Sequence, residues 1–175
     1  MTAAELERMP DDDSVRTELD EGELITMPPA AGDHGYYEIE IAVLLRNFVR
    51  KHKLGRVYVG ETGFRLNATT VRAPDVAFVR AERVAKMRQQ GFLEGAPDLA
   101  VEIFSPSDSV RQLMRKVKQY FAAGTHTVWI AYPEDRAINV LEASGADRLL
   151  KGDEVVEAPE LLPGFSARVP EFFPD

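Results

Sequence analysis

The chain of 175 residues contains no cysteine, so it has neither a disulfide framework nor a thiolate metal site. Nor does it carry an excess of positive charge, since 29 acidic residues outnumber 21 lysines and arginines and the formal net charge is −8. This balance argues against a surface that binds nucleic acid over its whole extent, but it permits a local basic strip. The absence of cysteine is compatible with the reducing cytoplasm, where we expect the protein to reside.

Long apolar segments are missing as well. Residues 1–13 contain no apolar stretch of the kind found in signal peptides, and no apolar run approaches the ~18 residues that suggest a membrane span. We therefore expect neither a signal peptide nor a membrane partner. The pattern G-x-S-x-G is also absent, which argues against a serine hydrolase with a nucleophile elbow.

What the chain does have is enough apolar sequence for a core. Its hydrophobic content is 45%, and its length suits one domain. Residues 1–15 are polar and include three consecutive aspartates, so we expect an acidic, irregular lead-in. Residues 16–175 are expected to form a single domain.

The first half of this domain contains a hairpin and a long helix. Residues 16–27 predict two short strands around the turn Asp20-Glu21-Gly22. Asp33 is placed as the N-cap of a helix from His34 to His52, whose apolar residues recur at helical spacing, and Gly55 is expected to end it. Residues 56–66 and 74–80 predict two antiparallel neighbouring strands, and residues 81–95 a polar connection.

The second half contains a strand–helix–strand unit at residues 98–104, 108–123 and 127–132. We expect its two strands to be parallel, with a right-handed crossover. Ser107 is expected to cap the helix and Gly124 to end it. A hairpin should follow at residues 133–135, and residues 136–157 should add short peripheral strands.

Glu102 lies in the interior of an apolar strand, and this position is the most informative in the chain. A buried charge is costly unless it is neutralised, paired or bound to a metal. Asp75 opens another apolar run and can lie beside Glu102 if the two strands are neighbours. Asp98 is on the same face of the same strand as Glu102 but about 13 Å away, too far to share one ion directly. The alternative for Glu102 is a structural ion pair with Arg72 or Arg65.

Three further groups can join these carboxylates. His34 and Glu38 are separated by one helical turn and point towards the apolar side of their helix, so Glu38 could supply a third acid and His34 a proton shuttle or phosphate contact. Lys116 and Lys118 flank the apolar stripe of the later helix, and geometry alone leaves both open. Carboxylates suit Mg²⁺, and a lysine supplies a compact positive charge, so such a set indicates a metal-dependent phosphodiesterase site.

A basic stretch stands apart from this set. Arg46, Arg50, Lys51, Lys53 and Arg56 fall in a segment without acids, and Arg46, Arg50 and Lys53 lie opposite the apolar stripe of their helix. These side chains either form a solvated helix face or contact a nucleic-acid backbone, in which case binding should depend on salt.

Taken together, these residues resemble the Uma-two family of restriction-endonuclease-like proteins in the PD-(D/E)XK nuclease superfamily. The resemblance extends from about residue 17 to residue 173, and the order and spacing of its short motifs make it specific. The motifs are Glu21-Gly22-Glu23, Met27-Pro28-Pro29 with His34-Gly35, Gly60-Glu61-Thr62-Gly63-Phe64, Pro74-Asp75-Val76, Val101 to Ser107, Lys116 with Tyr120, and Gly124 followed by Trp129 and Pro133.

The resemblance implies an α/β fold in which a mixed β-sheet is flanked by helices and carries peripheral hairpins. It also implies that Asp75 and Glu102 are metal ligands and that Lys116 is the catalytic lysine, because the family places it four residues before a tyrosine. Phe104 departs from the usual E-x-K pattern, so the lysine must reach in from the helix.

We therefore expect a DNA endonuclease that uses Mg²⁺ or Mn²⁺ to hydrolyse phosphodiester bonds. Its catalytic residues would be Asp75, Glu102, Lys116, Glu38 and His34, with Asp75, Glu102 and Glu38 holding the metal. A homodimer is also expected, since cutting both strands usually needs two sites. The alternative is a non-catalytic nuclease-fold module that binds DNA or a partner protein, and the missing strand lysine and the net charge of −8 favour it.

Overall fold

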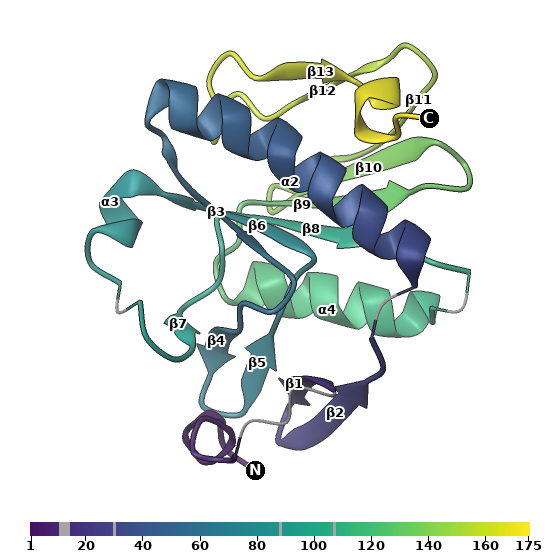
Figure 1. The fold of residues 1–175 in the computed structure, drawn as a ribbon. Coiled ribbons are helices and arrows are strands. Elements are labelled where there is room, and N and C mark those ends of the chain that lie inside the picture. The colour runs from purple at the N-terminus through teal and green to yellow at the C-terminus, as the bar shows by residue number, and fades with distance from the viewer. Residues whose placement is uncertain (11–14, 30, 88, 107) are drawn as a thin grey trace.

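A six-stranded mixed sheet lies at the centre of the computed structural model, which describes residues 1–10, 15–29, 31–87, 89–106 and 108–175 (Figure 1). Its strand order is β11-β10-β9-β8-β6-β3, in which β8 and β9 are parallel and all other neighbours are antiparallel. The inner strands are buried on both faces, which is why they read as nearly continuous apolar runs. The strands are β3 (Gly55–Val59), β6 (Val76–Arg80), β8 (Leu99–Ile103), β9 (Thr127–Tyr132), β10 (Ala137–Glu142) and β11 (Asp147–Lys151).

Two long helices cover opposite faces of this sheet (Figure 1). They are α2 (Gly32–His52) and α4 (Val110–Ala122). Val101 and Trp129 belong to the apolar cluster on the α2 side, whereas Ala100 and Ile130 belong to the cluster on the α4 side. Because side chains alternate along a strand, Glu102 faces the same side as Ala100, towards α4.

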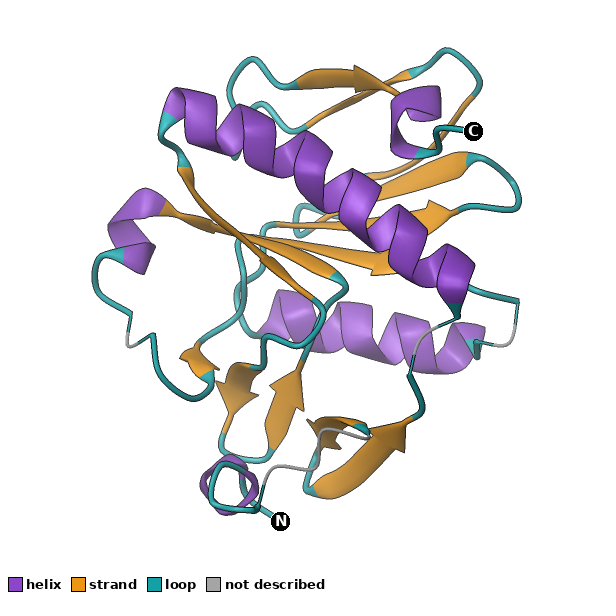
Figure 2. Ribbon diagram, viewed as in Figure 1, coloured by secondary structure: helices purple, strands orange, loops and turns teal. Residues whose placement is uncertain are grey.

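A second mixed sheet lies below α4 in the view of Figure 2. Its strand order is β2-β1-β5-β4-β7, and only β4 and β7 pair in parallel among the strands described. Asp20, at the end of β1, accepts hydrogen bonds from Arg115 and Gln119 of α4, so polar contacts join this sheet to the helix. The strands are β1 (Arg16–Asp20), β2 (Glu23–Met27), β4 (Phe64–Asn67), β5 (Thr70–Arg72) and β7 (Leu93–Glu94).

Shorter elements complete the fold. The C-terminal segment packs on the α2 side, where Phe172 and Phe173 join the apolar cluster and the Tyr37 ring lies 5.7 Å from that of Phe173. No helix among the described residues is both long and apolar enough to cross a membrane. The remaining elements are α1 (Ala3–Leu6), α3 (Ala81–Val84), β12 (Val155–Glu157), β13 (Ser166–Arg168) and a 3-10 helix, η1 (Val169–Phe172).

The structure confirms the hairpin at residues 16–27 and the parallel strand–helix–strand unit, and it confirms that Gly124 follows the end of α4 with a positive φ of 101°. Residues 56–66 do not form one strand, because the chain turns after Val59 and passes from the central sheet into the second one. Residues 137–142 form an inner strand rather than a peripheral one, since β10 pairs with both β9 and β11.

The helix ends also differ from expectation. Ala31, not Asp33, is the N-cap of α2, and Lys53 ends that helix in a left-handed conformation, so Gly55 already belongs to β3. Ser107 lies outside the described residues, and the N-cap of α4 is Ser109, whose hydroxyl accepts a hydrogen bond from the Gln112 N–H.

The N-terminal segment is more ordered than an irregular lead-in. Thr2 and Glu5 form a capping box on α1, and Ala3 and Leu6 are buried in a small cluster with Leu19 and Val71. Residues 11–14, which contain the consecutive aspartates, lie outside the described residues. The division into a lead-in and a single domain stays a prediction.

Substitutions of Trp129 test the packing of the core on the central sheet. Its side chain is fully buried, and its ring lies 5.8 Å from the rings of both Phe165 and Phe172. Replacing Trp129 with alanine should lower the free energy of unfolding by about 3–5 kcal/mol, because a large cavity remains between β9 and the C-terminal segment. Trp129→Phe is the matched control and should cost only about 1–2 kcal/mol. Urea denaturation measures both, and equal losses would contradict this account of the core.

Candidate functional site

A pocket of about 250 Å³ opens where β1, the start of α2, the end of β8 and the start of α4 meet. It brings together residues that are widely separated in the sequence. Both strand carboxylates, the helix histidine and one of the two candidate lysines line it, together with charged residues of β1 and β5. The charged and histidine side chains are Arg16, Glu18, Asp20, His34, Arg72, Asp75, Glu102, Asp108 and Lys116.

Asp75 and Glu102 lie side by side, as expected from the sequence. Val76 of β6 pairs with Val101 of β8 in an antiparallel ladder, so the residues next to that pair, Asp75 and Glu102, are adjacent. Both are buried, with 5% and 6% of their surfaces exposed. Asp75 Oδ2 accepts a hydrogen bond of 2.7 Å from the Ile103 N–H, which fixes its carboxylate at the end of β8.

The first two turns of α2 bring His34 and Glu38 to Asp75. His34 Nε2 lies 3.0 Å from Asp75 Oδ1, and Glu38 Oε1 accepts a hydrogen bond of 3.1 Å from the Gly60 N–H. One ligand atom from each of these three residues lies within 4.8 Å of the others. Two carboxylates and an imidazole at this spacing suit a divalent cation such as Mn²⁺.

Their electrostatics are coupled. The hydrogen bond to Asp75 raises the pKa of His34 above its usual value, against the opposing effect of burial. Burial would raise the pKa of Asp75, but the His34 interaction and the Ile103 N–H outweigh it and lower that pKa. Burial raises the pKa of Glu38. A cation that takes His34 Nε2 as a ligand must therefore displace a tightly held proton, so metal binding should strengthen as the pH rises.

Glu102 is held by residues of α4. The Tyr120 hydroxyl donates a hydrogen bond of 2.7 Å to Glu102 Oε1, and Lys116 Nζ lies 3.5 Å from Oε2. Lys118, on the other flank of α4, is exposed and does not line the pocket, so the structure selects Lys116 of the two lysines as the one beside Glu102.

The ion pair that we considered for Glu102 is not made with either arginine. Arg72 instead pairs with Glu18 and Asp20, at 2.8 and 2.9 Å, and Arg65 pairs with the exposed Glu94. Since these carboxylates already engage both guanidinium groups, the cation that faces Glu102 is the Lys116 ammonium.

Burial and the neighbouring charges shift the pKa values of Glu102 and Lys116 in opposite directions. Burial raises the pKa of Glu102 to about 7, although the nearby ammonium of Lys116 opposes this shift. Burial alone would lower the pKa of Lys116, but the negative charges of Glu102 and Glu18 outweigh it and raise that pKa. Lys116 therefore remains cationic at neutral pH, whereas Glu102 can exchange a proton there.

Sequence reasoning missed the contribution of β1. Glu18 is 1% exposed, and its carboxylate accepts hydrogen bonds from Arg72 and from the Ala73 N–H while lying 3.0 Å from Lys116 Nζ. Arg16, two residues earlier, donates to the Gly60 carbonyl and lies 3.7 Å from Asp75. The available signal was the alternation of charged residues at positions 16, 18 and 20, which places them on one face of the strand.

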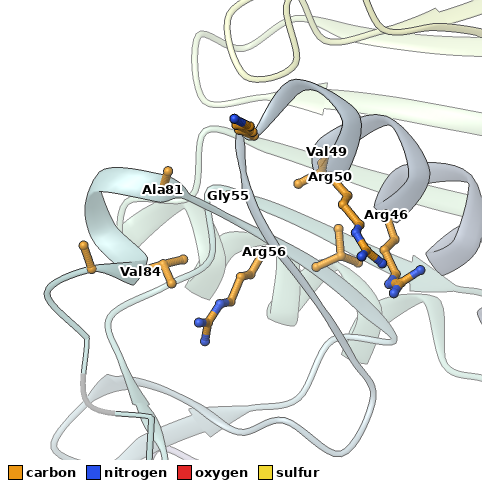
Figure 3. Close-up of a pocket in the computed structure, with 10 residues that line it drawn as sticks. Arg46, Val49, Arg50, Gly55, Arg56, Ala81 and Val84 are labelled. Carbon is orange, nitrogen blue, oxygen red and sulfur yellow. The ribbon is translucent and has the colours of Figure 1, made fainter.

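Other predicted residues lie elsewhere. Asp98 accepts a hydrogen bond from the Arg80 N–H and pairs with Arg83 at 3.0 Å, so it joins the ends of neighbouring strands. Arg46, Arg50 and Lys53 line a different pocket, near the C-terminal end of α2 (Figure 3). The pocket is therefore lined by Asp75, Glu102, Lys116 and His34, and Glu38 joins His34 and Asp75 in the ligand cluster without lining the pocket. None of the three predicted backbone-binding residues lines it.

The raised pKa of Glu102 predicts a pH-dependent stability. The pKa of Glu102 in the folded state, about 7, lies above the ordinary value of 4.5, so the folded state binds the Glu102 proton more tightly than the unfolded state does. Ionisation of Glu102 therefore lowers the free energy of unfolding, and this penalty is absent below pH 4.5 and complete above pH 7. Glu102→Gln carries no such penalty. In the presence of a metal chelator, the free energy of unfolding of Glu102→Gln relative to that of the wild type should therefore increase by roughly 3 kcal/mol between about pH 5 and pH 8.

Chemical denaturation at both pH values measures this difference. Glu61→Gln removes an exposed carboxylate outside the pocket and is the matched control, for which we expect the same offset from wild type at both pH values. A Glu102→Gln offset that also stays constant with pH would contradict the burial argument.

Comparison with known proteins gives two matches of different kinds. The profile of the Uma2 family, described as "Putative restriction endonuclease", matches residues 3–170. A solved structure, described as "a putative nuclease belonging to DUF820 from Anabaena variabilis", is similar to this chain with a TM-score of 0.83 at 19% identity, over 99% of this chain and 97% of that one. None of the curated proteins matches. The structural likeness confirms the expected α/β fold, and the family match over nearly the whole length establishes that this chain belongs to the Uma2 family.

Proposed function

We propose that this protein is a metal-dependent endonuclease that hydrolyses phosphodiester bonds in DNA. The observation that carries the proposal is the convergence of Asp75, which precedes β6, Glu102 of β8 and Lys116 of α4 in one pocket that also contains His34. Catalytic sites bring together buried acids and a cation with shifted pKa values, whereas a structural ion pair needs only two partners. The family description, a restriction endonuclease, supports the same reaction class.

Asp75, Glu38 and Glu102 would hold Mg²⁺ or Mn²⁺, with His34 beside them. The residues fit such an ion, because the carboxylate oxygens are hard ligands and those of Asp75 and Glu38 already lie within 4.8 Å of one another and of a His34 ring nitrogen. When bound, the ion would polarise the phosphate and lower the pKa of a coordinated water.

The remaining steps belong to side chains. Lys116, kept cationic by Glu18 and Glu102, would donate a hydrogen bond to the attacking water and stabilise the negative charge that develops on the phosphate. Tyr120 holds Glu102 in place through its hydroxyl. His34, whose Nε2 lies 3.0 Å from Asp75 Oδ1, is placed to contact a phosphate oxygen or to pass a proton to the leaving group.

The runner-up function is a nuclease-fold module that binds DNA or a protein without cutting. One argument for it is the absence of lysine at the second position after Glu102. Because the ammonium of Lys116 lies 3.5 Å from Glu102 Oε2, the same charge is supplied from α4, and this argument for an inactive protein loses its force. The homodimer and the cytoplasmic location stay predictions, which the mass of the protein in solution and cell fractionation would test.

Removing either strand carboxylate should abolish metal binding and cleavage together. We expect Asp75→Asn and Glu102→Gln to lose Mn²⁺ binding in calorimetry and to reduce cleavage of plasmid DNA by roughly 10²–10³-fold, because the metal and its charge stabilisation are lost. Glu38→Gln should weaken Mn²⁺ binding as well, since one ligand is removed.

Glu40→Gln is the matched control for Glu38→Gln, because both residues are on α2 and are half-buried, but Glu40 is not part of the ligand cluster. It should bind Mn²⁺ and cut as the wild type does. If Asp75→Asn and Glu102→Gln cut as fast as the wild type, the assignment of Asp75 and Glu102 to the active site is wrong. If the wild type binds no Mn²⁺ and cuts no DNA, the non-catalytic module is favoured.

Lys116 should act on the chemical step rather than on metal binding. We expect Lys116→Met to lower the single-turnover cleavage rate by roughly 10²–10³-fold. The affinity for Mn²⁺ should be kept or increased, because the carboxylates of Glu18 and Glu102 lose a competing cation. Lys118→Met removes an exposed lysine from the same helix and should leave both quantities unchanged. Circular dichroism checks that both variants fold. Equal cleavage by the two variants would rule out Lys116 as the catalytic lysine.

A further inference from the structure

A second pocket, of about 560 Å³, lies between the C-terminal half of α2, the start of β3 and α3 (Figure 3). Four cationic side chains line it: Arg46, Arg50 and Lys53 from α2 and its end, and Arg56 from β3. In Figure 3 the side chains of Arg46 and Arg50 extend from α2 to one side of the view, and that of Arg56 extends from β3 to the other. Among the residues that the structure describes, none that lines the pocket is acidic, although the whole chain carries a net charge of −8.

These cations are exposed and largely uncommitted. Arg46, Arg50 and Lys53 form no ion pair with any residue in the described ranges, and Arg56 donates a single hydrogen bond to the Gln89 side chain. By contrast, Arg65, Arg83 and Arg115 each pair with a carboxylate. A cluster of unpaired like charges creates a local positive potential that attracts anions.

Part of the pocket lining is apolar, since it includes Val49, Val57 and Val84. Apolar walls lower the local dielectric and concentrate the field of the surrounding cations, which strengthens the attraction for an anion. Arginine forks match the geometry of phosphate oxygens and can bind them through paired hydrogen bonds. The chemistry of the pocket therefore suits a phosphate group.

The pocket lies at a defined distance from the candidate active site, because α2 connects the two. Glu38 is in the active-site cluster, and Arg46 and Lys53 follow it on the same helix at about 12 and 22 Å, given a rise of 1.5 Å per residue. The strand charge of DNA repeats every 3.4 Å along the duplex axis, so for a duplex that lies along α2 this separation corresponds to about four to six base pairs.

We propose that this pocket binds a backbone phosphate of the DNA duplex, about four to six base pairs from the phosphodiester bond that lies in the active site. The inference rests on the proposed nuclease function for its choice of DNA over a free phosphate ion. It assigns to the basic residues a positioning role, in which they hold the flank of the duplex while Asp75, Glu102 and Lys116 act on the bond that is cut.

The test compares the double variant R46A/R50A with the control double variant K51A/K118A, which also removes two exposed cations but none that lines the pocket. Binding of a fluorescent duplex of about 20 base pairs is measured by anisotropy over a range of salt concentrations in Ca²⁺. R46A/R50A should bind about tenfold more weakly at low salt, and the slope of log K against log salt should decrease by about 2, because two phosphate contacts are lost. K51A/K118A should match the wild type.

Cleavage of duplexes of different length gives a second readout. Extending the duplex from about 6 to about 20 base pairs should raise kcat/KM in the wild type and the control, because a cut near the middle of the shorter duplex leaves about three base pairs on either side, too few to reach the pocket. R46A/R50A should lose this gain. Titration with inorganic phosphate separates the two sources of the anion. If R46A/R50A loses affinity for phosphate but binds and cuts DNA like the wild type, the pocket takes a free ion and the proposal is overturned.

The failure of this inference can be told apart from the failure of the nuclease proposal. If the wild type cuts DNA but R46A/R50A has an unchanged salt slope, only the pocket is wrongly assigned. If no variant cuts but R46A/R50A still shows the reduced slope, the pocket assignment holds and the catalytic one falls. If the wild type does not bind DNA in Ca²⁺ even at low salt, both are wrong.

Discussion

The rest of the structure depends on how the negative charges that are concentrated in one buried pocket are balanced. Glu18, Asp75 and Glu102 are each at most 6% exposed, and carboxylates that are close together in a low dielectric repel one another strongly. Lys116 and Arg72 balance them, at 3.0 and 2.8 Å from Glu18. These two cations come from different parts of the fold, so α4 and the second sheet must both pack against the central sheet for the pocket to exist.

The way in which the two sheets are joined follows from this requirement. Arg72 of β5 contacts Glu18 and Asp20 of β1 as well as Gln119 of α4, so one guanidinium connects three elements. Removing one charged residue from a buried network leaves the other charges unpaired, and this loss of stability is larger than the stability that the intact network contributes. Such an arrangement is poorly explained as a device for stability alone. It is better explained by a site that needs a cationic lysine beside acids at neutral pH.

The sequence predicts the central part of the fold because that part is locally encoded. The βαβ unit reads directly from two apolar runs and an amphipathic helix. The adjacency of Asp75 and Glu102 depends instead on the antiparallel pairing of β6 with β8, which the sequence leaves as a condition. The second sheet could not be predicted in the same way, since its strands are short and polar and their pairing depends on long-range contacts. For this reason Glu18 escaped notice. The alternation of charges at residues 16–20 places Glu18 on one face of a strand, but its partners, Arg72, the Ala73 N–H and Lys116, are distant in the sequence.

The charge pattern of α2 has two separate causes. An aspartate near its N-terminus and cations in its last turn complement the helix dipole, so Arg50, at least, has a sufficient structural reason to be basic. That explanation does not extend to Arg56, which is on β3 and lies outside the helix. Its side chain nevertheless lines the same pocket as Arg46 and Arg50, where it increases their repulsion. A cluster assembled across two elements against its own repulsion is expected where an anion is bound, and a helix dipole alone would not produce it.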